Sequence, residues 1–322
     1  MATPVFTPSG RPTRMADFAV AASERAARDL SDYDELLAWS IAEPDAFWSL
    51  VWDHFGVVGT RGEVAAAPSS LPQATFFPGA QLNIVDTYLR PDPARDDEGA
   101  PIVVQTAEVG DGIAVVASLT RDELLERVAA VATALRTRGV TPGDRVALVL
   151  PVGIDALVVT LAALAVGGVV SSAAPEFGVP AIVDRFGQLD PVVLVGTTSY
   201  SWAGRRHDRR DHLVELVRSL PSVRSLLVVP GSDDPTSPID PDVVDLAGLA
   251  ARCVAGSRRI LQVELLADME RRHRGAALET EPLGFDDPAY VLFSSGTTGK
   301  PKCLVHRAGG VLVKHLVEAG LH

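Results

Sequence analysis

From residue 145 onward, short apolar runs alternate with stretches in which apolar residues recur at helical spacing. The runs rich in Val and Leu fit buried strands, because a strand covered on both faces has no polar side to expose. The stretches between them fit amphipathic helices. Strands are expected at 145–150, 169–172, 192–195 and 225–229, and helices at 154–166, 179–189 and 213–220. This alternation predicts an α/β fold with a mainly parallel sheet covered by helices.

A strong helix is predicted just before this region, from residue 121 to about 138. Thr120 is a typical N-cap, Glu123 completes a capping box, and Gly139 is a typical helix end. The apolar residues at helical spacing form a single stripe that is expected to be buried: Leu124, Val128, Val131 and Leu135.

The N-terminal part of the chain has its own pattern. Helices are expected from Ser31 and from Pro44, because both residues are typical of helix starts, and another helix should end near Leu89. Aromatic residues in the second helix indicate simple core packing: Phe47, Trp48, Trp52 and Phe55. Residues 90–101 are rich in Pro, Asp and Gly and predict a surface linker. The expected organisation is therefore a flexible lead at 1–30, a small helical domain at 31–95 and a main domain at 96–322.

Composition narrows the class of protein. The chain has 322 residues with 47% hydrophobic residues, which allows a sizeable core, and a formal net charge of -12, which argues against a nucleic-acid partner. The two cysteines, Cys253 and Cys303, are too few for a disulfide framework or a metal site, so a reducing compartment, the cytosol, is expected. Cys303 is expected to be a small buried residue. Residues 1–15 do not resemble a secretory signal, and the apolar run at 156–170 is too short to span a membrane.

The most informative stretch for function is 290–302, which has the sequence YVLFSSGTTGKPK. An apolar run gives way to hydroxyl groups, glycines and lysines, which is typical of a strand that leads into an anion-binding loop. Glycines let backbone N–H groups approach phosphate oxygens, hydroxyls can donate to phosphate or ligate Mg²⁺, and lysines supply positive charge. The candidate phosphate-binding residues are Ser294, Ser295, Gly296, Thr297, Thr298, Gly299, Lys300 and Lys302.

Two common nucleotide-binding motifs are excluded. A Walker A loop requires Ser or Thr after Gly299-Lys300, where this chain has Pro301, and Ser294 takes the place of its first Gly. Gly110-Asp111-Gly112 lacks the third glycine of a dinucleotide fingerprint. A generic loop of this composition would more often be a solvated turn.

A longer match favours a phosphate site. The stretch from Val291 to Lys302 resembles, position by position, the phosphate-loop signature of the adenylate-forming superfamily of acyl-CoA synthetases. A second stretch, from Ser171 to Leu194, is similar to the acetoacetyl-CoA synthetase branch and contains SSAAPEFGV and DRFGQ. The helix that carries Trp39 and Trp48, together with residues 77–83, is similar to the N-terminal domain that this branch shares with acetyl-CoA synthetases. The resemblance covers most of the chain from about Ser31.

The resemblance implies a ligase that uses ATP, Mg²⁺ and CoA. The loop would hold the β- and γ-phosphates of ATP, with Thr297 or Thr298 near Mg²⁺. The carboxylate of a small acid would attack the α-phosphorus, and the acyl group would then be transferred to the thiol of CoA. A second loop aligns with the family's contact to the nucleotide end of CoA: Trp202, Ala203, Gly204 and Arg205. Trp202 replaces an arginine found in acetyl-CoA synthetases, and a solvated basic turn is an equally good interpretation of this loop.

Family members are about twice as long, and their adenine pocket, ribose-binding Asp and catalytic Lys would lie beyond His322. The expectation is therefore the N-terminal part of an adenylation domain, with no catalytic residue assignable within this chain. Two functions remain open. One is part of a ligase for acetoacetate, or for acetate or propionate, and the other is an inactive remnant that binds without chemistry.

Overall fold

The computed structural model describes residues 13–66, 74–91, 99–109, 112–231, 245–294 and 299–321. The chain divides into two compact units. The larger comprises Tyr88–Pro282 and Pro288–His306, and the smaller comprises Met1–Thr87, Leu283–Asp287 and Arg307–His322.

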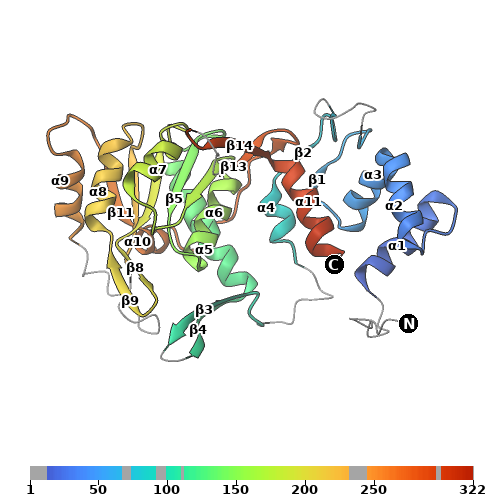
Figure 1. Cartoon of the computed structure of the whole chain (residues 1–322), viewed down its shortest axis with the longest axis horizontal. Coiled ribbons are helices and arrows are strands. Elements are labelled where there is room, and N and C mark those ends of the chain that lie inside the picture. Colours follow the sequence, from blue (N-terminus) through green and yellow to red (C-terminus); the bar gives the residue numbers. More distant parts are fainter. Residues whose placement is uncertain are drawn as a thin grey trace. The chain divides into compact units, whose positions relative to one another are not determined.

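The larger unit is built on a seven-stranded sheet, shown in Figure 1. Its strand order is β11-β10-β7-β5-β6-β13-β14. Pairs β5–β6, β5–β7, β7–β10, β10–β11 and β6–β13 are parallel. The strands are β5 (Arg145–Val149), β6 (Val169–Ala173), β7 (Val193–Thr197), β10 (Ser225–Val229), β11 (Gln262–Leu265), β13 (Pro288–Ser294) and β14 (Lys302–Arg307).

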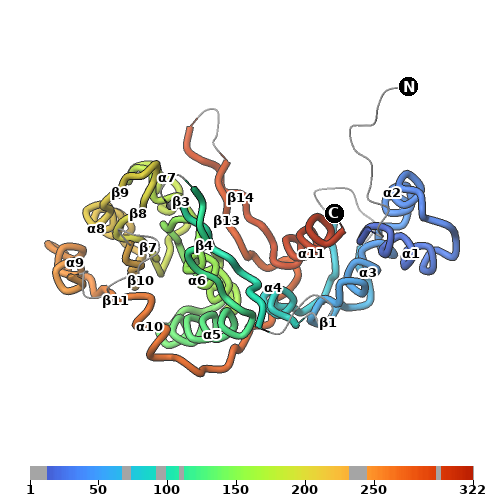
Figure 2. Tube along the Cα trace, turned by 90° about the horizontal axis from the view of Figure 1, so that it is seen from below, coloured from blue at the N-terminus to red at the C-terminus, as the bar shows by residue number. Residues whose placement is uncertain are grey.

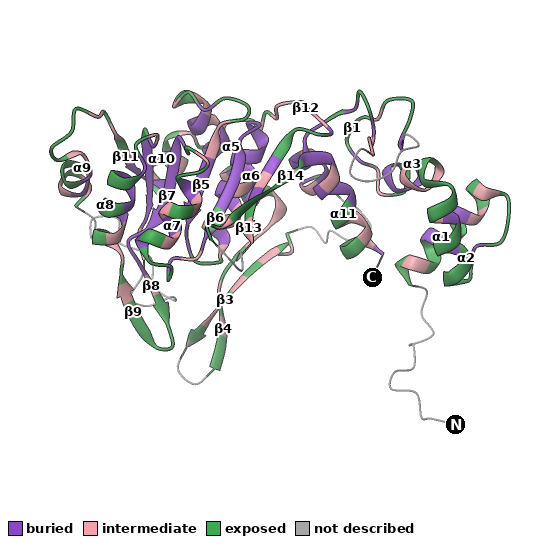
Figure 3. Ribbon diagram, turned by 45° about the horizontal axis from the view of Figure 1, so that its top comes forward, coloured by how far each residue is buried: buried purple, intermediate pink, exposed green. Residues whose placement is uncertain are grey.

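Helices cover both faces of this sheet, as Figure 2 shows. One layer holds α5 (Arg121–Thr137), α6 (Ile154–Ala165) and α10 (Leu266–Arg272), and the other holds α7 (Val179–Phe186), α8 (Arg210–Ser219) and α9 (Leu246–Val254). Strands β5, β7 and β10 are almost wholly buried, whereas β14 at the edge is mostly exposed (Figure 3). The predicted α/β fold with a mainly parallel, helix-covered sheet is confirmed.

Most predicted elements of this unit form within a few residues of their expected bounds. Thr120 caps α5, and both hydrogen bonds of the capping box are present. All four residues of its predicted stripe are buried. Helix α8 begins at Arg210, earlier than expected, because Asp208 accepts a hydrogen bond from the Arg210 backbone N–H at 2.9 Å and orders the first turn.

Two hairpins differ from the sequence expectations. β3 (Val103–Val109) pairs with β4 (Gly112–Leu119), and β8 (Ser199–Trp202) pairs with β9 (Arg205–Asp208). The stretch expected to be a loop from Trp202 is thus the tip of a hairpin. Cys303 was expected to be buried, but it is exposed because β14 is an edge strand of the sheet.

The smaller unit is mainly helical. Its helices are α1 (Arg14–Ala26), α2 (Tyr33–Ala42), α3 (Pro44–His54), α4 (Ile84–Tyr88) and α11 (Ala308–Gly320), and its short strands β1 (Gly59–Thr60), β2 (Gln81–Leu82) and β12 (Leu283–Gly284) form a three-stranded sheet. The segment assigned to a flexible lead contains α1, which Thr13 caps. This helix forms because Phe18 is fully buried and stands edge-on to Phe47 at 5.9 Å.

The predicted aromatic packing in α3 is confirmed. Phe47 lies edge-on to Trp39 with ring centroids 6.1 Å apart, and Trp52 contacts Phe77 at 4.9 Å. Trp39 is the largest fully buried side chain among the described residues.

Across the described ranges, every helix is too short or too polar to cross a membrane.

Candidate functional site

Strand β13 leads directly into the candidate phosphate loop. Ala289 and Val291 are buried, and Tyr290 lies opposite Val170 in the parallel pairing with β6. The Ser171 hydroxyl donates a buried hydrogen bond of 2.7 Å to the Val291 carbonyl oxygen. Because β5, β6, β7 and β13 run the same way, the loop leaves the sheet at its carboxyl edge, where parallel α/β sheets bind their ligands.

The structure describes the two ends of this loop. Ser294 is the half-buried last residue of β13, and Lys302 is the exposed first residue of β14. Gly299 has φ of 102°, in the region that favours glycine, and Lys300 next to it is exposed. Ser295, Gly296, Thr297 and Thr298 lie outside the described residues.

The loop joins two neighbouring strands. β13 and β14 are adjacent in the sheet, and their connection at 295–301 is shorter than the dozen or so residues that a parallel crossover needs. The two strands therefore form a hairpin (Figure 2). Within the described ranges, no ion pair joins Lys300 or Lys302 to a carboxylate.

The second candidate region is the tip of the β8–β9 hairpin. Trp202 pairs with Arg205 across a two-residue turn in which Ala203 and Gly204 have φ of 50° and 69°. Such a turn matches the twist of the two strands, and its positive φ values suit Gly204. Trp202 is 72% exposed, and Arg205 is exposed as well.

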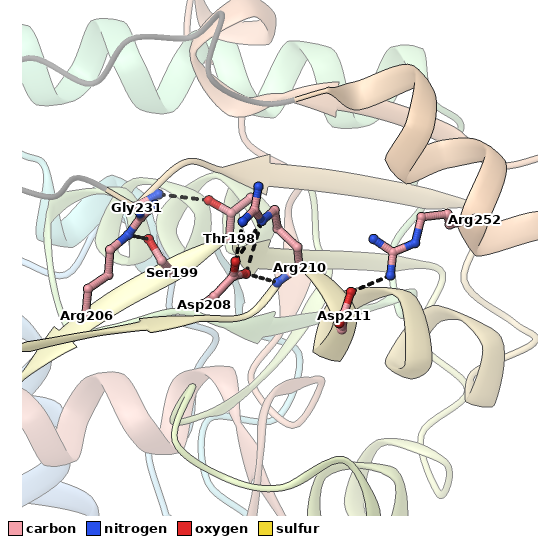
Figure 4. A network of polar contacts seen from close by, with 8 residues as sticks. All are labelled: Thr198, Ser199, Arg206, Asp208, Arg210, Asp211, Gly231 and Arg252. Atoms are coloured by element: carbon pink, nitrogen blue, oxygen red, sulfur yellow. Dashed lines mark hydrogen bonds and ion pairs between the residues drawn. The ribbon is translucent and has the colours of Figure 1, made fainter.

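The other arginines of this hairpin have internal partners. Arg206 donates through Nε to the Ser199 hydroxyl at 3.0 Å, and Arg210 binds Asp208, as Figure 4 shows. The hydrogen bonds from Arg210 hold the pKa of Asp208 below its ordinary value. Arg209 donates to the Tyr200 hydroxyl at 2.9 Å and stacks over its ring. Among the described side chains of the hairpin, Arg205 is the guanidinium that no such bond engages.

A third loop reaches the same edge of the sheet after β6. The Phe177 carbonyl oxygen lies 2.9 Å from His212 Nε2 of α8, and the Arg185 guanidinium of α7 lies over the Phe177 ring at 5.3 Å from its centroid. Burial lowers the pKa of His212. The loop carrying the SSAAPEFGV resemblance is therefore held by both helices that flank it. These contacts depend on tertiary packing, and no sequence signal singled out His212.

The two predicted groups of residues lie on one edge of the sheet but on different strands. The candidate phosphate loop follows β13, and the β8–β9 hairpin follows β7. Because β13 and β7 run in the same direction, both segments start at the carboxyl edge of the sheet. Within the described residues, no cluster of three or more His, Cys, Asp or Glu side chains could hold a metal ion.

Comparisons with known proteins identify this arrangement. Residues 71–319 match the model of the AMP-binding enzyme family, and residues 33–87 match the acetyl-coenzyme A synthetase N-terminus. The acetoacetyl-coenzyme A synthetase of Rhizobium meliloti (strain 1021) is 35% identical over 96% of this chain and 43% of its own length. The acetoacetyl-CoA synthetase of Xenopus tropicalis is 31% identical over 98% of this chain and 45% of its own.

A solved structure shares the fold. The acetoacetyl-CoA synthetase from Streptomyces lividans superimposes with a TM-score of 0.82 at 35% identity, covering all of this chain and 46% of that one. The chain thus spans less than half the length of these relatives. The resemblance to acetoacetyl-CoA synthetases seen in the sequence is confirmed, and the chain belongs to the AMP-binding enzyme family.

Proposed function

We propose that this chain is the nucleotide-activating part of an acid–thiol ligase that converts acetoacetate, ATP and CoA into acetoacetyl-CoA, AMP and pyrophosphate. One observation carries the proposal: a strand of the parallel sheet delivers the predicted phosphate loop to the carboxyl edge, with two lysines at its exit. The named relatives, all acetoacetyl-CoA synthetases, support the choice of acid.

In the first half-reaction, a carboxylate oxygen of acetoacetate attacks the α-phosphorus of ATP, and the bond to the bridging oxygen breaks to release pyrophosphate. Negative charge grows on the departing β-phosphate. Lys300, Lys302 and the loop hydroxyls would stabilise this charge, because fixed donors that point at a developing charge lower the barrier without reorganising. In the second half-reaction, the CoA thiolate attacks the acyl carbonyl and AMP leaves with the bonding electron pair.

The loop also suits Mg²⁺. Hydroxyl oxygens such as that of Ser294, together with phosphate oxygens, are the hard ligands that this cation takes. When bound, Mg²⁺ would neutralise part of the pyrophosphate charge. For CoA, the proposed contact is the tip of the β8–β9 hairpin, where Arg205 suits a phosphate and Trp202 offers a flat apolar face. We place the reaction in the cytosol, which two unpaired cysteines suit.

The test is acid-dependent ATP–pyrophosphate exchange, measured on this chain and on the product of the complete reading frame that encodes it. We expect exchange with acetoacetate at a higher kcat/KM than with acetate or propionate in the complete product. A preference for acetate or propionate would exclude the proposed acid but not the reaction. Absence of exchange with every carboxylic acid would contradict the ligase itself and favour a binding remnant.

We expect this chain alone to show no exchange, because it spans less than half the length of the relatives it matches. Carboxylate-dependent exchange by residues 1–322 alone would show that the phosphate loop has sufficient partners within this chain.

A further inference from the structure

Gln188 connects the end of helix α7 to the exit of the phosphate loop. Its Nε2 donates to the Pro301 carbonyl oxygen at 3.0 Å and to the Asp184 carbonyl oxygen at 2.7 Å. Its Oε1 lies 3.6 Å from the Cys303 thiol, which donates to it. A side-chain amide has two N–H donors and one carbonyl acceptor, so every polar group of Gln188 has a partner. The side chain is therefore held in one orientation although it is exposed.

The helix behind Gln188 is a fixed support. Ile182 and Phe186 are fully buried in the core cluster between α7 and the sheet. The helix stops at Gly187, whose N–H donates to the Val183 carbonyl oxygen at 2.9 Å. A Cβ atom at Gly187 would lie 2.7 Å from that same oxygen, which is backbone and cannot easily shift. Gln188 thus projects from a helix end whose position the core determines.

The contacted residues lie between and beside the two lysines of the site. Pro301 separates Lys300 from Lys302, and Cys303 follows Lys302 on β14. β14 is an edge strand, so one side of it lacks a neighbouring strand. An anchor at Pro301 and Cys303 compensates for that by fixing the backbone on both sides of Lys302. Loss of the anchor would let the exposed start of β14 fray.

We propose that Gln188 is a positioning residue that fixes the exit of the phosphate loop, at 299–303, and so presents Lys300 and Lys302 in one geometry to the phosphates. This inference rests on the proposed function for its ligand, but the anchoring contacts themselves do not depend on it. Gln188 would touch neither ATP nor the acid. It would act through the backbone that carries the lysines.

The first test follows the backbone directly. The chain has three lysines, Lys300, Lys302 and Lys314, and a protease specific for lysine does not cut the bond before Pro301. Cleavage of the Lys302–Cys303 bond therefore reports the loop exit, and cleavage after Lys314 in α11 serves as an internal reference. We expect Gln188→Ala to speed cleavage at Lys302 several-fold at an unchanged rate at Lys314. Gln188→Glu has the same length but lacks both donors, so it should behave like the Ala variant.

A matched control is Gln262→Ala, which removes an exposed amide from the start of β11 on the opposite edge of the sheet. It should cleave like the unmodified chain at both lysines. Circular dichroism should be the same for all three variants, because neither glutamine is buried. If Gln188→Ala and Gln188→Glu left the cleavage rate at Lys302 unchanged, the anchoring role would be wrong.

The second test measures binding of Mg²⁺–pyrophosphate by calorimetry. Loss of the anchor should weaken binding about three- to ten-fold, the effect of one or two modest hydrogen bonds, and Gln262→Ala should bind like the unmodified chain. If the unmodified chain bound no pyrophosphate, the phosphate-site assignment would fail, whatever the variants did. If the unmodified chain bound and Gln188→Ala bound equally well, the positioning role alone would be overturned.

Discussion

Ser171 of β6 and Val291 of β13 are joined by a hydrogen bond of 2.7 Å from the serine hydroxyl to the valine carbonyl oxygen, out of contact with solvent. This bond lies next to the single register pair that links the two strands, Tyr290 opposite Val170. The side chain therefore supplements a short ladder. It holds the strand that leads into the candidate phosphate loop against the rest of the parallel sheet.

We expect Ser171→Ala to lower the free energy of unfolding of the larger unit by about 1–3 kcal/mol, because the Val291 carbonyl would be buried without its donor. Urea unfolding followed by circular dichroism measures the change. Ser172→Ala is the control, since Ser172 is exposed on the same strand. Equal effects of the two substitutions would mean that the hydroxyl contributes nothing specific to the β6–β13 pairing.

Arg127 joins three helices of the larger unit. It donates from α5 to Asp155 of α6 at 2.7 Å and to Glu270 of α10 at 2.7 Å. Burial raises the pKa of Glu270 even though Arg127 opposes the shift. In Arg127→Met the two carboxylates would face each other without a cation. We expect the free energy of unfolding to fall by about 2 kcal/mol at neutral pH. The loss should be smaller than for a fully buried pair because these side chains are partly exposed.

The deficit of Arg127→Met should depend on pH. Without Arg127 the folded-state pKa of Glu270 lies further above its unfolded value, so folding favours the protonated form. Stability is then fully present below the ordinary glutamate pKa and is lost as pH rises through the raised one. Unfolding measured from neutral pH downward should show the deficit shrinking. The control is Arg271→Met, which removes an exposed partner of Asp268 and should change the free energy of unfolding little at any pH. A deficit in Arg127→Met that stayed constant with pH would exclude this explanation.

His212 gives a second pH-dependent expectation. Its Nε2 contacts the Phe177 carbonyl, while Nδ1 is buried without a partner among the described residues, and burial lowers its pKa. Protonation would place an unsatisfied N–H inside the protein. Stability should therefore fall as pH drops from the ordinary histidine value of 6.5 to the depressed one, and level off below it.

The variant His212→Gln tests this expectation, because an amide can still donate to Phe177 but does not titrate. Its stability should decline less than that of the unmodified protein as the pH is lowered from 7 through the range in which histidine titrates. Parallel pH curves for the two proteins would show that His212 is not the group responsible. His54→Gln in the smaller unit is a useful comparison, since burial lowers the pKa of His54 as well.

The sequence predicted the parts of the fold that local pattern determines. Buried parallel strands and capped helices have signals that do not depend on distant residues, and Thr120 with Glu123 is one example. The β3–β4 hairpin was not predicted, although Gly110 and Asp111 are residue types that often form the turn of a hairpin. Helix α1 was missed since its burial depends on Phe47, far along the chain.

The candidate site divides in the same way. The residue types of the candidate phosphate loop could be identified from the sequence because their chemistry is local, and their binding of phosphate stays a prediction. The anchor from Gln188 to Pro301 was not, because it joins positions 113 apart and arises from how α7 packs on the sheet. Cys303 shows the opposite error: burial was expected because a free cysteine usually behaves as a small buried residue, but the position of β14 at the sheet edge leaves it exposed.

For the β8–β9 hairpin, we expect Arg205→Ala to weaken CoA binding about ten-fold, as expected for loss of a charge-assisted contact to phosphate, and Trp202→Ala to weaken it less. Arg258→Ala removes an exposed arginine elsewhere in the same unit and should bind CoA normally. Titration of CoA into the complete product followed by calorimetry measures the constants. Equal small losses for all three variants would favour a solvated basic turn without a specific role.

The last expectation concerns Lys302, using Lys302→Ala in the complete product. Removing a donor that points at developing phosphate charge costs on the order of 10²–10³ in rate, so adenylation measured by ATP–pyrophosphate exchange should collapse. Transfer of the acyl group from separately supplied acyl-adenylate to CoA should be nearly normal, because pyrophosphate has already left. Lys314→Ala, whose ammonium pairs with Glu318 on α11, should leave both half-reactions intact. If both half-reactions of Lys302→Ala slowed equally while circular dichroism stayed unchanged, the lysine would have to position the acyl group or a mobile part of the protein. The loop would then not be the pyrophosphate-binding site that its sequence predicts.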